Sequence, residues 1–486
     1  MQRFDEIEEK YAVAHVRVCS EEDLVGVLRV AQRETAIDLL SRKFFHLERS
    51  QNGWFDLELM GPDGRKIFAH NAIAMSKGKH QPQDHGTTHF ASVHPNILVM
   101  DSRGLDSDRR VAAVHFQVEG LKNFFYYQYT EPLDCSGISE EARATLLGMR
   151  YDQEQEKDFN EPAFAFIVHE LKEVLEFRVE KRLYRVWMGG NESYSWGQHF
   201  QFRIRPTAAI LFDEPVTIEE ALNRVWEWRR FFVQLAMQHL NFEAVGFLAS
   251  HDDRAAVGSV YLPNIDKRKA AEGHYKLGPA CIPLNSWNER EALSVAMRTW
   301  LEQSDTRKAF RARLDQVIDK INRRTDQMDI IELSAGIDSL AELDQKESYP
   351  EGAVAAMAEA AGSAAADHKV ALSVDRLRSI LAQLQRRSLA EKMRELGRRA
   401  MPEVDIQDIE LVISTARKCR DDATHRGAVS EQRQSQVGPV VEALASMCVA
   451  FDLRDAGVPR RSSNASSCYW VIRFSDALAE LKRQLG

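Results

Sequence analysis

The first part of the chain alternates hydrophobic and polar positions at the spacing of half-buried β-strands. Runs of this kind, separated by turn signals such as Gly61-Pro62-Asp63-Gly64, cover residues 12–18, 54–59, 111–116 and 200–204. Because successive side chains of a strand point to opposite faces, the pattern predicts a β-rich region. We expect a short helix to interrupt it over residues 162–176. The β-rich N-terminal region is assigned to residues 1–213.

The hydrophobic period changes after residue 213. Thr217, with Glu220 three positions later, has the capping-box pattern of a helix start, and apolar residues then recur at helical spacing as far as Leu240. A strand-like stretch lies beyond this helix at residues 258–262. We therefore expect residues 214–285 to complete the N-terminal region or to link it to the C-terminal part of the chain.

Nearly all of the chain from residue 286 onward has the hydrophobic period of helices. The expected helices are 286–303, 305–323, 326–345, 352–372, 374–400, 405–426, 430–452 and 470–485. The pattern predicts an all-helical domain over residues 286–486. The expected fold class is α+β, with a β-rich N-terminal region followed by an all-α helical bundle.

The net charge of −9 is unevenly distributed along the 486 residues. Residues 1–286 carry 34 Lys and Arg against 42 Asp and Glu, whereas residues 287–486 carry 30 against 31. The acidic excess argues against a protein that coats DNA without sequence preference, because phosphate affinity needs a positive surface. Between Arg376 and Arg399, however, eight basic residues outnumber two acidic ones. This segment is either a solvated helix surface or a basic face for a nucleic acid.

Several common classes of protein do not fit the sequence. No apolar run approaches the roughly 18 residues of a membrane helix, and the acidic start lacks the apolar core of a signal peptide. The six cysteines form no CxxC pair, so we expect reduced thiols and a cytoplasmic location. The chain has no Walker phosphate loop, GxGxxG, GxSxG or HExxH motif, so we expect neither an ATPase, a dinucleotide enzyme, an α/β-hydrolase nor a zincin.

One cluster of histidines is a candidate metal site. Its members are His80, Asp84, His85, His89 and His94. Imidazole and carboxylate groups are zinc ligands, so a loop could fold them around one ion. Histidines of a polar loop are the simpler interpretation, because the glycine and proline of the segment disfavour a helix that would align them. We expect no metal and no cofactor, with a zinc-dependent enzyme as an alternative.

The most informative segment is the helix expected over residues 405–426. At 100° per residue, its apolar stripe contains Ile409, Val412, Ile413, Ala416 and Ala423. Arg420 falls within the stripe, about 20° from Ile409, and an arginine there is costly unless an anion meets it. Asp421 and His425 lie four residues apart on a flanking face, so they can contact each other, and Gly427 supplies the C-cap. The structural alternative is an interhelical salt bridge, with Asp421 or Glu410 nearby.

The run Arg420-Asp421-Asp422-Ala423-Thr424-His425 resembles the signature of the HEPN superfamily, in which an arginine and a polar residue precede a histidine near the end of a helix. The run lies in a late helix of an all-helical domain, as it does in HEPN domains. Residues 330–340 and 375–381 also resemble the helix pair that opens such a domain. The N-terminal part, notably residues 214–236, is similar to that of the ApeA proteins, which are bacterial antiphage factors.

The resemblance implies a metal-independent endoribonuclease that acts in abortive infection. The RNA 2′-OH would attack the adjacent phosphorus, leaving a 2′,3′-cyclic phosphate and a 5′-OH. His425 would act as general acid or base, because imidazole exchanges protons near neutral pH. Arg420 would hold the phosphate and oppose its developing charge, and Asp421 would orient His425. The RNA backbone would be guided by Arg417, Lys418 and Arg426, together with the Arg376–Arg399 segment.

The expected partners are RNA, with tRNA as one candidate, an unidentified phage-derived trigger and at least one more copy of the chain. One motif supplies one imidazole, whereas 2′-OH attack benefits from both a base and an acid. A two-fold axis would bring two copies of Arg420 and His425 to one phosphate, so we expect a homodimer or a higher oligomer. The N-terminal region would sense the trigger and restrain the nuclease. The alternative is a non-catalytic HEPN scaffold or sensor that binds a nucleotide or RNA.

Overall fold

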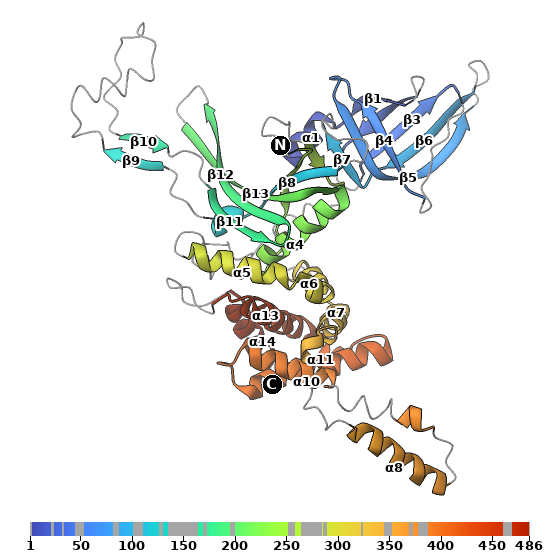
Figure 1. Ribbon diagram of the computed structural model, residues 1–486, viewed down its shortest axis with the longest axis vertical. Helices are drawn as coiled ribbons and strands as arrows, with labels where there is room; N and C mark the ends of the chain where they lie inside the picture. The colour runs from blue at the N-terminus through green and yellow to red at the C-terminus, as the bar shows by residue number, and fades with distance from the viewer. Residues whose placement is uncertain are drawn as a thin grey trace.

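Strands dominate the first half of the chain and helices the second half (Figure 1). The structure is a computed structural model. It describes residues 2–20, 24–31, 34–43, 53–80, 87–100, 110–125, 130–134, 164–168, 173–194, 200–250, 258–263, 284, 289–321, 324–344, 352–368, 373–377, 387–459 and 469–485. The expected division into a β-rich N-terminal part and a helical C-terminal part is confirmed.

The N-terminal part is built on one large antiparallel sheet. It begins with helix α1 (Phe4–Lys10), and a short helix α2 (Leu121–Phe124) comes after β8. Its strands are β1 (Ala14–Val18), β2 (Val25–Arg29), β3 (Ala36–Ser41), β4 (Phe55–Met60), β5 (Lys66–His80), β6 (Thr88–His94), β7 (Ile97–Met100), β8 (Arg110–Val118), β11 (Glu173–Val179), β12 (Arg182–Tyr194), β13 (Phe200–Thr217), β14 (Phe242–Leu248) and β15 (Gly258–Tyr261). Their order is β11-β12-β13-β8-β14-β15-β7-β5-β4-β1-β2-β3-β6, and β9 (Thr130–Asp134) pairs separately with β10 (Phe164–Val168).

Six of these strands close into a ring. The first part of β5 pairs with β4 as far as Ala72, and its second part pairs with β6 from Ile73 onward. Because β6 also pairs with β3, the pairing runs β4-β1-β2-β3-β6-β5 and returns to β4. Alternate side chains of β1 are buried in the ring, as the sequence pattern predicts for half-buried strands.

The helix expected over residues 162–176 is wrong. The described residues of this segment lie in strands β10 and β11, and residues 169–172 lie outside the description. Phe164-Ala165-Phe166-Ile167-Val168 is rich in aromatic and β-branched side chains, and the residues of β11 alternate between polar and apolar. Both features favour strands over a helix.

A single long helix, α4 (Ile218–Ala236), covers the sheet on the side that faces the C-terminal helices (Figure 1). It continues directly from β13, so the expected boundary at residue 213 falls within that strand. Thr217 caps the helix as predicted, with its hydroxyl accepting from the backbone N–H of Glu220 at 3.2 Å. Trp228 of α4 packs edge-on against Phe116 of β8 and Tyr184 of β12 at centroid distances of 5.4 and 5.1 Å. These apolar contacts make α4 part of the N-terminal half.

A buried histidine links the ring to the start of α4. His70 of β5 is 8% exposed and lies between the carboxylates of Asp56 and Glu219, with Nδ1 3.0 Å from Asp56 Oδ1 and Nε2 against Glu219. Burial alone would lower the pKa of His70, but the hydrogen bonds with both carboxylates outweigh it and raise the pKa to about 9. The hydrogen bond from His70 in turn lowers the pKa of Glu219 to about 2. The imidazolium therefore joins strands β4 and β5 to helix α4 at neutral pH.

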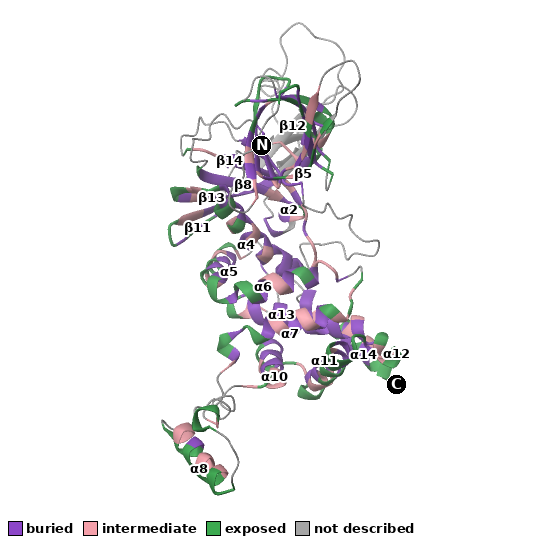
Figure 2. Cartoon of the chain, turned by 90° about the vertical axis from the view of Figure 1, so that its right-hand side faces the viewer, coloured by how far each residue is buried: buried purple, intermediate pink, exposed green. Residues whose placement is uncertain are grey.

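The C-terminal part consists of helices packed around one buried helix. The helices are α5 (Arg290–Glu302), α6 (Ser304–Ile318), α7 (Gln327–Asp338), the short 3₁₀ helix η4 (Ala341–Leu343), α8 (Ala353–Asp367), α10 (Leu389–Ala400), α11 (Ile406–Arg426), α12 (Glu431–Gln434), α13 (Val437–Asp455) and α14 (Tyr469–Leu485). α13 is buried on nearly all sides, which fits its mostly apolar sequence (Figure 2). α8 stands apart from the other helices and buries only Ala358.

Candidate functional site

The helix that carries the HEPN-like motif begins and ends close to its predicted limits. Asp405 caps the start of α11, accepting from the backbone N–H of Gln407 at 2.9 Å. Gly427 ends the helix in the left-handed conformation with φ 76°, a conformation that glycine adopts without steric cost. All five residues of the predicted apolar stripe are buried. The helical prediction for residues 405–426 is therefore confirmed.

Arg420 lies half-buried at the edge of this buried face. Glu410, one of the two carboxylates expected near it, is engaged by Arg394 of α10, whose Nη2 lies 3.0 Å from Glu410 Oε2. The hydrogen bond from Arg394 lowers the pKa of Glu410. Among the residues that the structure describes, no side chain forms an ion pair with Arg420. The guanidinium is therefore partly desolvated and has no internal counter-ion in this part of the chain.

Asp421 and His425 are both exposed on the outer side of α11, together with Arg417, Lys418 and Thr424. The helical spacing places Lys418, Asp421 and His425 on one face, within one turn of each other. No hydrogen bond joins Asp421 to His425 among the described residues. The orienting role of Asp421 therefore stays a prediction.

The carboxylate with a structural role in the motif is the neighbouring Asp422, which is 5% exposed. Arg433 of α12 donates to Asp422 Oδ2 at 2.5 Å, and Arg426 Nη1 lies 3.4 Å from Oδ1. Burial alone would raise the pKa of Asp422, but the hydrogen bonds from Arg433 and Ser430 outweigh it and lower the pKa. Asp422 and Arg433 were missed by the sequence analysis. The burial of Asp422 could have been predicted from its position, because it lies three residues after Cys419 and so shares the buried side of the helix.

The end of α11 is also tied to the start of α7. Gln327, the first residue of α7, donates from Nε2 to the carbonyl of Gly427 at 3.2 Å and accepts from the backbone N–H of Val429 at 2.7 Å. Both bonds hold the turn that comes directly after His425. The position of the imidazole therefore depends on α7 and α12 as well as on α11.

The basic segment from Arg376 to Arg399 is partly used inside the fold. Lys392 is buried and donates to the carbonyl and carboxylate oxygens of Asp338 at 3.0 and 2.8 Å. Arg394 is held by Glu410, and Arg399 by Glu395. Arg378 and Arg386 lie outside the described residues. On α11, Arg417 and Lys418 are exposed, and the Arg426 side chain is 70% exposed although it contacts Asp422.

The histidine cluster is spread along the β5–β6 hairpin. His89 lies opposite Lys79, whereas His94 lies opposite Ile73. The two histidines are five positions apart along the strand, so they are separated by roughly 17 Å and lie on opposite faces of the sheet. Asp84 and His85 lie outside the described residues, as does the side-chain environment of His80. Within the described part of the chain, no group of three or more ligand-type side chains is placed to hold a metal ion.

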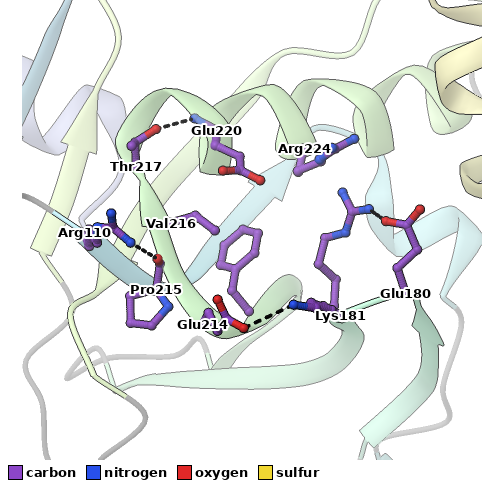
Figure 3. Close-up of a pocket in the computed structure, with 11 residues that line it drawn as sticks. Arg110, Glu180, Lys181, Glu214, Pro215, Val216, Thr217, Glu220 and Arg224 are labelled. Atoms are coloured by element: carbon purple, nitrogen blue, oxygen red, sulfur yellow. Dashed lines mark hydrogen bonds and ion pairs between the residues drawn. The ribbon is translucent and has the colours of Figure 1, made fainter.

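A pocket of about 400 Å³ opens beside the first turn of α4 (Figure 3). Its residues are far from the motif in the sequence. Its wall alternates cations with carboxylates. Lys181 lies 3.1 Å from Glu214, and Arg182 pairs with Glu180. Arg110 Nη1 donates to the carbonyl of Pro215 at 3.4 Å. Because the opposite charges are interleaved, the pocket concentrates no charge of one sign.

Comparison with known proteins gives no assignment. No protein-family profile, curated protein or solved structure matches the chain significantly. No helix among the described residues has the length and apolar character needed to cross a membrane.

Proposed function

We propose that the helical part of this protein is a metal-independent endoribonuclease of the HEPN type, which acts in the cytoplasm in abortive-infection defence against phage. The observation that carries the proposal is the setting of Arg420, a half-buried guanidinium for which the described residues supply no counter-ion. A phosphate is the anion that suits a planar guanidinium, because it can accept two parallel hydrogen bonds. His425 is exposed one and a half turns further along the same helix.

The two side chains match the needs of RNA cleavage by the 2′-OH. One imidazole takes the proton of the 2′-OH, the oxygen attacks phosphorus, and the bond to the 5′-oxygen breaks as that oxygen receives a proton from an acid. Arg420 opposes the negative charge that builds on the phosphorane. The products are a 2′,3′-cyclic phosphate and a 5′-OH. Arg417, Lys418 and Arg426 flank the pair and would attract the RNA backbone.

A second copy of the chain would complete the site. Proton removal and proton delivery need two groups at once, whereas each chain offers one motif histidine. His425 and the cations around it are exposed on the outside of α11, where a two-fold partner can reach them. We therefore propose a homodimer in which two motifs flank one phosphate. The N-terminal part would sense a phage-derived trigger.

The alternative function is a non-catalytic scaffold or sensor. The exposed cations of α11 favour a polyanionic ligand for either function. Among the described residues, no hydrogen bond joins Asp421 to His425, so Asp421 does not position the imidazole through such a bond. In this alternative, Arg420 and His425 would bind RNA or a nucleotide without reaction.

Purified full-length protein incubated with total RNA and with tRNA separates the two functions. Filter binding gives the affinity at several salt concentrations, and gel electrophoresis of the same samples shows fragments. Discrete fragments that increase with time support the nuclease. Salt-dependent binding with intact RNA supports the scaffold and overturns the proposed catalysis.

A further inference from the structure

The N-terminal end of helix α6 is firmly bonded to the rest of the helical part. Arg307 and Arg311 donate to the buried carboxylate of Asp452 in α13 at 2.8–3.0 Å. Trp300 of α5 donates to the same carboxylate at 2.9 Å. Burial alone would raise the pKa of Asp452, but the two arginines outweigh it and lower the pKa. A buried carboxylate with this many donors makes α5, α6 and α13 one unit.

Bonding is less complete where the C-terminal end of α6 meets α4. His239, just beyond α4, lies 2.5 Å from Asp319, just beyond α6, but Asp315 within α6 is poorly bonded. Asp315 of α6 is 9% exposed, and its Oδ2 faces two cations, Arg230 Nε at 3.5 Å and Arg229 Nη1 at 3.6 Å. These separations are too long for good hydrogen bonds. The other oxygen, Asp315 Oδ1, is buried without a hydrogen-bond partner among the described residues. The pKa of Asp315 is raised, and burial is the largest cause.

A second unsatisfied group lies one turn along α4. Gln234 lies four residues after Arg230, so the two side chains share a helix face. Gln234 is 1% exposed, and within the described part of the chain neither its amide nitrogen nor its oxygen has a hydrogen-bond partner. A buried polar group without a partner costs free energy, and a half-satisfied polar network is less stable than an apolar contact. Asp315, Arg230 and Gln234 are therefore poorly bonded within this buried contact, although His239 and Asp319 join the chain just beyond α4 and α6.

We propose that the α4–α6 contact is a joint with a second arrangement, in which the helical part shifts against α4 and Asp315, Arg230 and Gln234 gain partners or water. The boundary lies here because α4 is fixed to the sheet through Trp228, whereas α6 is fixed to α13 through Asp452. Packed interfaces that change state do so between discrete arrangements, and unpaired buried groups reduce the difference in free energy between them.

The joint connects the N-terminal part to the motif. Arg313 of α6 pairs with Glu332 of α7, and Lys320, two residues after α6, donates to Asp329 of α7 at 2.7 Å. Gln327 of α7 holds the turn after His425. A shift of α6 would therefore move the support of the imidazole. This regulatory role rests on the proposed function, whereas the existence of the joint does not.

The joint is tested by thiol labelling of the full-length protein with Gln234→Cys. Cys448 of α13 is a natural control, because it is fully buried in the helical part. Each labelling rate is determined by mass spectrometry and divided by the rate of the same cysteine in the unfolded protein. We expect the cysteine at position 234 to react at least tenfold faster than Cys448, because opening the joint exposes only the former. Equal protection of the two thiols would overturn the proposal.

A second variant keeps the test independent of the cysteine substitution. Replacing both Arg230 and Asp315 with leucine removes the unsatisfied charges, so labelling at position 234 should slow at least threefold with no loss of melting temperature. Unchanged labelling, or a fall in melting temperature, would contradict the joint. If wild-type protein cleaves RNA, the same double variant should alter the cleavage rate at least threefold. If labelling slows but the cleavage rate is unaltered, the regulatory role is overturned and the joint is not. If the wild-type protein does not cleave RNA at all, the proposed function fails, but the labelling result still tests the joint.

Discussion

Asp422 and Arg433 are joined across the turn that ends α11, with Arg433 Nη1 2.5 Å from Asp422 Oδ2. The bond fastens α12 to the helix that carries His425, and it closes the turn that Gln327 holds from the other side. The two adjacent aspartates of the motif therefore differ in role. Asp422 is buried and anchors the turn, whereas Asp421 is exposed.

We predict that Asp422→Asn lowers the melting temperature at pH 7, whereas the neighbouring Asp421→Asn leaves it unchanged. The pKa of Asp422 is lowered in the fold, so its ionised form contributes stability above the unfolded pKa of about 4 and the contribution is lost as the pH falls further. The difference between wild type and Asp422→Asn should therefore shrink below pH 4. Equal melting temperatures for both variants at pH 7 would contradict the assigned role.

The link between the ring and α4 should depend on pH. His70 has its pKa raised from 6.5 to about 9, so its contribution to stability is full below pH 6.5 and is lost as the pH rises toward 9. The contribution is on the order of 3 kcal/mol. Chemical unfolding between pH 5 and 9 should show His70→Gln destabilised most at low pH and approaching wild type at pH 9. The exposed His368→Gln is the control, and a pH-independent loss in His70→Gln would count against the charged link.

RNA cleavage should survive chelation of divalent metals. The proposed chemistry moves protons between His425 and the RNA, and no step uses a bound metal. Cleavage rates measured with and without EDTA should agree within about twofold. A loss of activity in EDTA that zinc or magnesium restores would move the assignment to a metal site.

The exposed cations of α11 should contribute to RNA affinity without sequence preference. Arg417→Ala and Lys418→Ala should each weaken binding, and each should reduce the slope of log affinity against log salt by about 1. Arg483→Ala is the matched control, because Arg483 is an exposed arginine of α14 whose neighbour Lys482 contacts the opposite end of α11, at Asp408. Affinities and slopes that are the same in all three variants would exclude this face as the RNA surface.

The helical part was more predictable than the sheet. Helix limits depend on local signals such as Asp405 and Gly427, so α11 was placed within one residue. Closure of the six-strand ring depends on β5 changing partners at Ile73, which joins residues far apart in the sequence and leaves no local signal. The expected helix over residues 162–176 failed because short apolar runs do not distinguish a helix from a strand.

The site was predictable in outline but not in its contacts. Helical spacing correctly placed His425 outside the buried face. It placed Arg420 within that face, whereas Arg420 is half-buried at its edge. The same spacing cannot show which carboxylates are already engaged, because Arg394 on α10 and Arg433 on α12 reach Glu410 and Asp422 through tertiary packing.

The most direct test of the nuclease assignment is the mapping of RNA product ends for His425→Ala beside His368→Ala. Both variants remove one exposed histidine from a helical segment, but only His425 belongs to the motif. We predict fragments with 2′,3′-cyclic phosphate and 5′-OH ends for wild type and His368→Ala. For folded His425→Ala we predict a loss of cleavage of at least a hundredfold. Cleavage by His425→Ala at the wild-type rate, with the same ends, would contradict the account.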